Sequence, residues 1–268
     1  MRAKQFTEAD TKTYYDISDD RYRKSWHPNG CKHWGYFDNL EEAIAYDDFL
    51  RACDRWDEYM LSQSQIAPTS RLLEIGSGNG NAAIWIAKQT GCEVVGLDLS
   101  DTHIENSRKK AEENPSLRLF FEKVSATDMP FDDASFTHVW SQATLYHIHE
   151  RALALKEIYR VLQKGGIFAF DDLVMPASKL DESAKKHVYE RLLVNDMFAP
   201  DFYKTYLTDL GFKLLESIDL SKHMQKSYAI QSQRIKEQYP ELSVSYQNSA
   251  NAVETGNLGL WFFLWEKV

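Results

Sequence analysis

A short apolar run that leads directly into a glycine-rich turn constrains this chain more than any other feature. The run and the turn read LEIGSGNG at residues 73–80. Residues 71–76 have the pattern of a buried strand, and residues 81–91 have the periodicity of a helix that ends at Gly91. Glycines between a strand and a helix let a ligand approach backbone amides that a Cβ atom would obstruct. The sequence therefore predicts a nucleotide-type ligand at this turn.

Strands and helices are expected to alternate on both sides of the turn. Further apolar strands are predicted at residues 93–99, 117–124, 135–142 and 167–173. Amphipathic helices are predicted after the second strand, to about Glu113, and over residues 150–162. A repeated strand–helix order implies a parallel sheet with helices on both faces.

The flanks are expected to belong to the same domain, because no linker rich in Pro, Gly or Ser separates them from the middle. Residues 1–40 are predicted to be an irregular, aromatic-rich lid segment, and residues 41–65 a long helix. Residues 66–175 form the expected ligand-binding core. Residues 176–268 are predicted to supply cap helices and closing strands, with a helical insertion at 175–198, a helix at 200–210, a strand at 212–219, a helical stretch at 223–238 and a last strand at 258–267.

Composition excludes several classes of function. The chain has 268 residues with 31 Lys+Arg against 40 Asp+Glu, a net charge of −9 that offers no track for nucleic-acid phosphates. No apolar run reaches the length of a membrane span, and the first residues lack the pattern of a signal peptide. The three cysteines are an odd, widely spaced set, so we expect reduced thiols, a cytoplasmic protein and no metal site. Cys31 is expected to lack the partner thiols that a nucleophilic role requires.

Two acids distinguish between the possible nucleotides. Asp98 ends the second predicted strand, where a carboxylate can accept hydrogen bonds from a ribose diol. Glu74 lies two residues before the first glycine, where it would repel a pyrophosphate but suits a ligand with a cationic amino-acid end. The spacing G-x-G-x-G also differs from the G-x-G-x-x-G of dinucleotide folds. These observations favour S-adenosylmethionine over NAD.

Five segments, in this order and spacing, resemble the motifs of the class I S-adenosylmethionine-dependent methyltransferases. They are LLEIGSGNG, GLDLS, SATDMPF, SFTHVWSQ and VLQKGGIF, within residues 66–175. The resemblance implies a Rossmann-like, doubly wound sheet of seven mostly parallel strands with an antiparallel last strand, a helical cap and an N-terminal lid. It also implies that S-adenosylmethionine is bound, and S-adenosylhomocysteine released, by a set of core residues that comprises Glu74, Gly76, Ser77, Gly78, Gly80, Asn81, Asp98, Leu99, Ser125, Ala126, Trp140, Ser141 and Gln142.

The lid segment contains Tyr14-Tyr15-Asp16, followed by Asp20, Tyr22, Trp26 and the run HWGYF at 33–37. In these residues it resembles the lid of a small-molecule branch of the family. This branch includes sarcosine/dimethylglycine N-methyltransferases, to which the C-terminal region is most similar, and phosphoethanolamine and tocopherol methyltransferases. By position, Tyr14 and His147 match a tyrosine–histidine dyad of the phosphoethanolamine enzymes, so both are expected to be catalytic. Tyr15 and Trp34 are expected at the cofactor, and His103 and His149 in solvent. The residues expected to bind the substrate are Tyr14, Tyr22, His33, Tyr146 and His147.

The resulting functional hypothesis is methyl transfer to a small molecule, with an amine nitrogen as the first choice of acceptor. A neutral histidine can accept a proton from an amine, and aromatic faces attract cations. The alternative is a C- or O-methyltransferase of a hydrophobic metabolite, which the lid aromatics also permit. A nucleotide-binding module without catalysis is the hypothesis from another class. The expected partner is a small-molecule substrate, with no nucleic acid, and a homodimer is possible.

Overall fold

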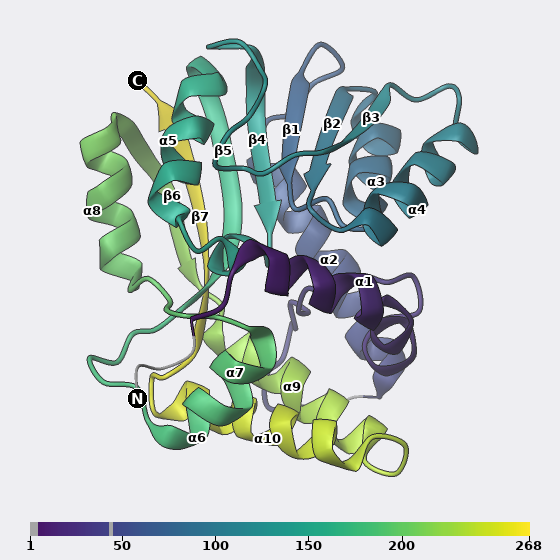
Figure 1. Cartoon of the computed structure of the whole chain (residues 1–268), viewed down its shortest axis with the longest axis vertical. Helices are drawn as coiled ribbons and strands as arrows, with labels where there is room; N and C mark the ends of the chain where they lie inside the picture. The colour runs from purple at the N-terminus through teal and green to yellow at the C-terminus, as the bar shows by residue number, and fades with distance from the viewer. Residues whose placement is uncertain (1–4, 43–44) are drawn as a thin grey trace.

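Seven strands form one mixed sheet in this computed structural model, which describes residues 5–42 and 45–268 (Figure 1). Their order across the sheet is β3-β2-β1-β4-β5-β7-β6. Strands β1 to β5 pair in parallel, whereas β7 runs antiparallel to β5 and β6. This arrangement confirms the predicted Rossmann-like fold. The strand bounds are β1 Arg71–Ile75, β2 Glu93–Asp98, β3 Leu119–Lys123, β4 Phe136–Gln142, β5 Leu162–Val174, β6 Phe212–Asp219 and β7 Gly259–Lys267.

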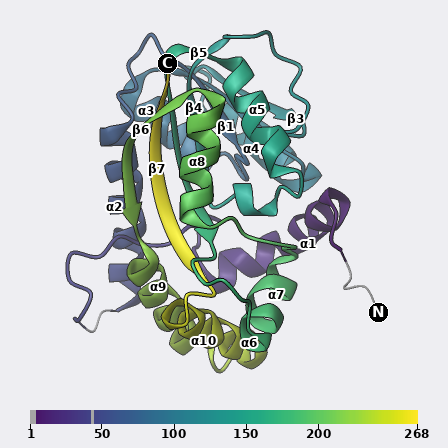
Figure 2. The same cartoon turned by 90° about the vertical axis from the view of Figure 1, so that its left-hand side faces the viewer.

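Helices cover both faces of the sheet because the buried strands are apolar on both sides. In β5, the side chains of Phe168 and Phe170 pack on one face, and those of Ile167 and Ala169 pack on the other. Figure 2 shows α5 and α8 on the first face and α2 and α3 on the second. The bounds of the covering helices are α2 Tyr46–Gln63, α3 Asn81–Thr90, α4 Asp101–Glu112, α5 Arg151–Val161 and α8 Pro200–Leu210.

A helical cap lies beyond the carboxyl ends of the strands (Figure 1). It contains a short interrupted helix within the predicted insertion, together with α9 and a helix, α10, that the sequence patterns did not predict. In α10 the residues buried against neighbouring elements are largely small, such as Ser243 and Ala250, so the helix lacks the apolar stripe that would reveal it. The cap elements are α6 Glu182–Ala184, a π-helical turn Lys185–Tyr189, α7 Glu190–Leu192, α9 Ser221–Ile235 and α10 Pro240–Glu254.

The lid segment contains a helix, so the prediction of an irregular first 40 residues is wrong over α1, Glu8–Ser25. Thr7 and Asp10 form a capping box at its start. Ion pairs four residues apart, such as Asp19 with Arg23, line its flank and are a sequence signal for a helix. The helix predicted at 41–65 begins at Tyr46 and ends at Gln63. Positions 1–4 and 43–44 of these predictions lie outside the described residues.

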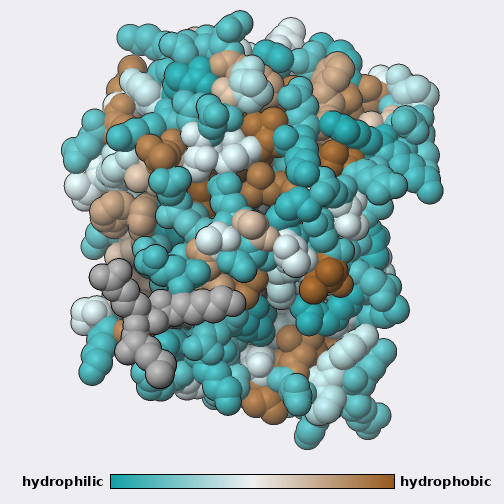
Figure 3. Space-filling view, in the orientation of Figure 1, coloured by the Kyte–Doolittle hydropathy of each residue, from teal (hydrophilic) through white to brown (hydrophobic). Residues whose placement is uncertain are grey.

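The surface seen in Figure 3 is mostly hydrophilic, and its hydrophobic residues gather in small separate groups. Across residues 5–42 and 45–268, none of the helices combines the length and the hydrophobicity that a membrane span requires.

Candidate active site

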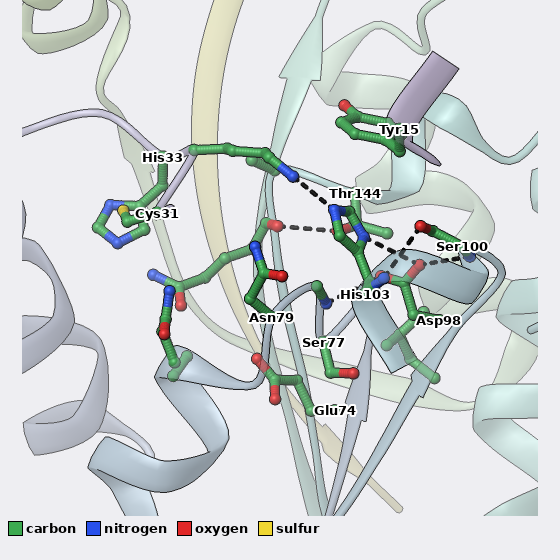
Figure 4. A pocket seen from close by; sticks show the side chains of 18 of the residues that line it. Tyr15, Cys31, His33, Glu74, Ser77, Asn79, Asp98, Ser100, His103 and Thr144 are labelled. Carbon is green, nitrogen blue, oxygen red and sulfur yellow. Dashed lines mark hydrogen bonds and ion pairs between the residues drawn. The ribbon is translucent and has the colours of Figure 1, made fainter. Parts of the chain in front are cut away.

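A cavity of about 250 Å³ lies where the strand order reverses between β1 and β4. Carboxyl ends of strands diverge at such a switch point and leave a crevice for a ligand. The loops after β1, β2 and β4 form one side of the cavity, and α1, the loop after it and α2 form the other. Figure 4 shows side chains from both parts pointing toward the same space.

The glycine turn brings backbone to the edge of the cavity. Gly76 has a φ of +72°, and a Cβ atom there would lie 2.2 Å from the side chain of Thr144. Gly78 has a φ of +51°, and apart from Gly78 and its two chain neighbours no atom of the described chain lies within 4 Å of the position its Cβ would take. Gly76 therefore permits close packing against the loop after β4, whereas Gly78 leaves open space in which a ligand can approach the backbone.

Glu74 presents an acceptor that lacks a partner. The residue is 4% exposed and lines the cavity, and its Oε2 atom has no hydrogen-bond partner within the described part of the chain. Burial, together with the nearby carboxylates of Asp98 and Asp57, raises the pKa of Glu74 to about 8. A buried acceptor of this kind is stabilised by a cation. The position therefore fits an ammonium group.

Asp98 is held in a fixed orientation. Its Oδ2 accepts from the Gly78 amide at 2.8 Å, and its Oδ1 accepts from the Ser100 amide at 2.8 Å. The Nδ1 atom of His103 lies 3.2 Å from Oδ1. Although burial opposes the charged form, the His103 side chain and the two backbone amides lower the pKa of Asp98. Asp98 is therefore an anion with its oxygens directed by these donors, as a ribose diol requires.

His103 is buried, which contradicts the prediction that it is solvated. It is 3% exposed, and its Nε2 atom lies 2.7 Å from the Nζ atom of Lys32 in the loop after α1. Burial lowers the pKa of Lys32 to about 8, which still leaves most of these side chains as ammonium groups at pH 7. An ammonium can only donate, so Nε2 of His103 accepts and Nδ1 carries the hydrogen directed at Asp98. A chain of hydrogen bonds thus connects the lid to the end of β2.

Tyr15 is the lid tyrosine that contacts His147. The distance from Tyr15 Oη to His147 Nε2 is 2.6 Å, and both residues line the cavity. Tyr14, the residue predicted for this role, instead bonds Tyr22 at 2.9 Å and lies outside the cavity lining. Consecutive side chains on a helix point about 100° apart, so only one of the two can face His147.

The protonation of this pair follows from its burial. Burial lowers the pKa of His147 to about 3, so the imidazole is neutral at ordinary pH. Burial also raises the pKa of Tyr15 well above its ordinary value, so the phenol keeps its hydrogen. The Tyr15 hydroxyl therefore donates to His147, and its oxygen can accept hydrogen bonds in turn. The Tyr146 side chain also interacts with Tyr15.

A charged pair lies on the lid and α2 side of the cavity. The Nε2 atom of His33 lies 3.2 Å from Oδ1 of Asp57, and its Nδ1 atom lies 3.1 Å from the Trp34 carbonyl oxygen. Both partners are acceptors, so both ring nitrogens donate and the ring is an imidazolium. Although burial opposes this charge, Asp57 and Cys31 raise the pKa of His33 well above its ordinary value. Asp57 also accepts from the Gln142 amide at 2.8 Å.

Most of the core residues predicted for the cofactor line the cavity, but several lid and strand residues do not. The predicted residues that line it are Tyr15, His33, Glu74, Gly76, Ser77, Gly78, Asn81, Asp98, Leu99, Ala126, Gln142 and His147. Those that lie outside its lining are Tyr14, Tyr22, Trp34, Gly80, Ser125, Trp140, Ser141 and Tyr146.

The predicted residues that lie outside the cavity lining have partners elsewhere in the fold. Trp34 packs edge-on against Trp26 and Tyr228 in the core, so its ring lies away from the cavity lining. On β4, Trp140 is buried and donates to Gln142, and Ser141 donates to the Ile75 carbonyl. Tyr146 is buried, and its amide donates to Asp172. Gly80, with a φ of +72°, serves as the N-cap of α3.

Further hydrogen bonds tie α1 to the loops of the core. Asp16 accepts from the Ser100 hydroxyl at 2.6 Å, and Asp19 accepts from the Asn79 amide at 2.6 Å. The Ser125 hydroxyl, at a position predicted for the cofactor, donates to Glu8 of the lid at 3.0 Å. The lid is therefore closed over the ends of β1, β2 and β3.

Sequence patterns missed several residues of the cavity wall. Lys32 had no signal, because its partner His103 is 71 positions away. Cys53 and Asp57 are four residues apart, so their common face of α2 was detectable, but nothing indicated that this face meets the lid. Cys53 interacts with Cys31 through its thiol, which contradicts the expectation that Cys31 has no partner thiol.

The site holds anionic, cationic and aromatic groups but no recognisable metal cluster. Within the residues that the structure describes, no group of three His, Cys, Asp or Glu side chains is placed to hold a metal ion. The cavity can accept a cationic group at Glu74, a diol at Asp98 and a second molecule between Tyr15 and Asp57.

Comparison with known proteins gives a consistent result. Residues 73–170 match a family model described as a methyltransferase domain. A sarcosine/dimethylglycine N-methyltransferase of Halorhodospira halochloris is 35% identical over 198 residues, which cover 73% of this chain and 69% of that protein.

Two solved structures share the fold over nearly the whole chain. One, from Galdieria sulphuraria, is described as a sarcosine dimethylglycine methyltransferase. It has a TM-score of 0.81 at 19% identity and covers 94% of this chain and 98% of its own. The other is the geranyl diphosphate C-methyltransferase of Streptomyces coelicolor, with a TM-score of 0.80 at 14% identity over 97% of this chain and 98% of its own.

Proposed function

Because the chain belongs to the class I S-adenosylmethionine-dependent methyltransferases, we propose that it transfers a methyl group to an amine nitrogen of a small molecule. The observation that carries the choice of acceptor is the partly buried Tyr15–His147 hydrogen bond, in a cavity whose lid and α2 side carries Asp54 and Asp57. The Tyr15 oxygen accepts hydrogen bonds, and the two carboxylates are anions. Such groups suit an amine substrate that donates an N–H and gains positive charge during methyl transfer. The relative from Halorhodospira halochloris, named for N-methylation, supports the same choice.

The residues present fit the cofactor. The partnerless Glu74 Oε2 suits its ammonium, Asp98 suits its ribose diol, and the open space at Gly78 admits it against the backbone. Leu99 and Ala126 line the same part of the cavity and offer apolar contact for its adenine. When bound, S-adenosylmethionine supplies a methyl group activated by a sulfonium.

The chain's own residues would then orient the acceptor and exclude water. His147 is neutral and accepts the hydrogen of the Tyr15 hydroxyl. The Tyr15 oxygen can then accept a hydrogen bond from an N–H group of the amine substrate. Alignment of a nucleophile in this way is the main contribution an enzyme makes to an in-line displacement. The α1 helix, held against the core loops by Asp16 and Asp19, would limit the access of water to the cavity.

A hydrophobic acceptor is the second candidate. The side chain of Trp85 lines the cavity together with Ile75 and Ile148, and such a surface suits a prenyl or phenolic molecule. Methyl transfer would then go to carbon or oxygen, and the Streptomyces coelicolor enzyme is named for transfer to carbon.

A transfer assay with isotopically labelled cofactor separates the two. The full chain is incubated with sarcosine, dimethylglycine and phosphoethanolamine, and in parallel with a simple phenol and geranyl diphosphate. Product formation with one or more amines is expected. If the phenol or the prenyl diphosphate is methylated and no amine is, the proposed nitrogen acceptor is wrong.

Variants of the pair test its role. We expect His147→Ala to lower kcat by about a hundredfold and Tyr15→Phe by a smaller factor, with cofactor affinity nearly unchanged, because both groups act on the acceptor. Tyr14→Phe and His149→Ala are the matched neighbours, and they lie outside the cavity lining. Equal losses in the Tyr14 and Tyr15 variants would remove the pair from the mechanism.

A further inference from the structure

Two of the three cysteines lie on the wall of the cavity. Cys31 belongs to the loop after α1 and is partly exposed, and Cys53 belongs to α2 and is 1% exposed. The Sγ atom of Cys53 lies 3.9 Å from the carbonyl oxygen of His33, two positions after Cys31, so the two thiols come close enough to interact although they are 22 positions apart. Cys92 is buried just before β2 and does not line the cavity, so it provides an internal reference.

Cys31 lies in a cationic environment. Figure 4 shows its sulfur beside the ring of His33, and the two side chains interact. His33 is an imidazolium because its two nitrogens face the Asp57 carboxylate and a backbone carbonyl. His27 also lines the cavity and favours a negative charge on Cys31.

The two thiols differ in ionisation. Although burial opposes the charge, the Cys53 thiol and the His33 imidazolium lower the pKa of Cys31 well below its ordinary value. Burial raises the pKa of Cys53 instead. A thiolate is the reactive form of cysteine, so Cys31 is the nucleophile of the pair and Cys53 stays protonated beside it.

We propose that Cys31 and Cys53 form a modification site for hydroperoxides, in which Cys31 is the attacking sulfur, Cys53 is the resolving sulfur, and the product is a disulfide across the cavity wall. The oxidant is hydrogen peroxide or an organic hydroperoxide. The disulfide joins the loop after α1 to α2, so it adds a covalent link between the lid segment and α2.

The chemistry balances in two steps. The Cys31 thiolate attacks one peroxide oxygen, the O–O bond breaks, and the leaving oxygen takes a proton and departs as water or an alcohol, which leaves a sulfenic acid on Cys31. The Cys53 sulfur then attacks the sulfenic sulfur, and the S–O bond breaks. The departing hydroxide takes the Cys53 proton as water. The two thiols together lose two electrons, and the peroxide gains them.

The experiment is thiol mapping of the full chain after brief treatment with limiting hydrogen peroxide. Non-reducing peptide mass spectrometry is expected to find a Cys31–Cys53 disulfide that dithiothreitol reverses. In Cys53→Ser, Cys31 is expected to accumulate as a sulfenic acid that dimedone traps. Cys31→Ser should form no intramolecular disulfide, and Cys92→Ser should behave like the unaltered chain. Circular dichroism of each variant checks that it is folded.

Reactivity of the separate thiols gives a second readout. Under limiting iodoacetamide, Cys31 is expected to be alkylated at least about tenfold faster than Cys92, because only Cys31 is a thiolate in an accessible position. The proposal would be overturned if Cys31 were alkylated at the same rate as Cys92. It would also be overturned if, in place of the Cys31–Cys53 bond, the disulfide contained Cys92 or joined two chains.

Oxidation is also expected to reduce methyl transfer, and this part rests on the proposed function. Mapping and alkylation do not depend on turnover. A chain that forms the disulfide but methylates nothing would therefore contradict the proposed methyl transfer and support the thiol site. A chain that methylates an amine but forms no disulfide would support the methyl transfer and contradict the thiol site.

Discussion

At the scale of single residues, Asp98 is the side chain on which we expect cofactor affinity to depend most. Its oxygens are oriented by Gly78, Ser100 and His103. Asp98→Ala is expected to weaken S-adenosylmethionine binding by about 1.5–3 kcal/mol, because a charged hydrogen-bond acceptor is lost. Calorimetric titration measures the change.

The control is Asp201→Ala, whose side chain is 95% exposed and pairs with Lys204 at the surface, where an ion pair contributes little. If Asp98→Ala binds the cofactor as tightly as the Asp201 variant, Asp98 does not hold the ribose.

The raised pKa of Glu74 predicts that cofactor binding releases a proton. Its pKa of about 8 means that most of these carboxyls are protonated at pH 7. A bound ammonium favours the ionised form, so binding should release between about half a proton and one proton, and affinity should rise with pH between about 6 and 7.5. Calorimetry in buffers of different ionisation enthalpy measures the release.

The Glu74→Gln variant has no proton to lose at this position, so its release should be close to zero. Equal release by the variant and the unaltered chain would show that another group supplies the proton.

At the scale of elements, α1 is held over the core by Asp16 and Asp19. These two carboxylates bond Ser100 and Asn79 at the amino ends of α4 and α3. Replacing both by alanine is expected to raise hydrogen–deuterium exchange over residues 8–25 in the free protein, because the helix opens more often. Strand β5, which is central in the sheet, should keep its protection.

Asp20→Ala is the matched control on the same helix. Its side chain is 76% exposed and pairs with Lys24. Exchange over α1 that rises equally in this variant would show that helix propensity, and not contact with the core, holds the lid.

The order of strands and helices was predictable because its signals are local. The apolar runs at β1 and β2, the glycine turn, and Ser100 as the cap of α4 each involve residues within a few positions of one another. The α10 helix was not predictable from periodicity, because its buried face is built largely from small side chains that fit only against neighbouring elements such as α9.

At the scale of the whole molecule, the lid and the C-terminal cap share one aromatic core around Trp26. Trp26 follows α1, is 3% exposed, and contacts Phe49 of α2, Tyr228 of α9 and Tyr246 of α10. Its indole N–H donates to the His33 carbonyl at 2.9 Å. The segment after α1 is therefore part of the packed interior as well as a cover for the cavity.

Trp26→Ala is expected to lower the free energy of unfolding by about 3–5 kcal/mol, because it opens a cavity among four elements. Urea denaturation measures the change. Ile17→Ala, at a site on α1 that is 77% exposed, should change it by less than about 0.5 kcal/mol. A small effect at Trp26 would show that the cap is stable without the lid.

The sequence by itself determined the Rossmann-like core, the glycine turn, and the acids Glu74 and Asp98 at the ends of β1 and β2. Only the tertiary structure decided that Tyr15 and not Tyr14 meets His147, that His103 is buried under Lys32, and that Cys31 has a partner thiol. The reason is separation along the chain. Strand, turn and cap signals act between near neighbours, whereas these contacts join segments up to 132 positions apart.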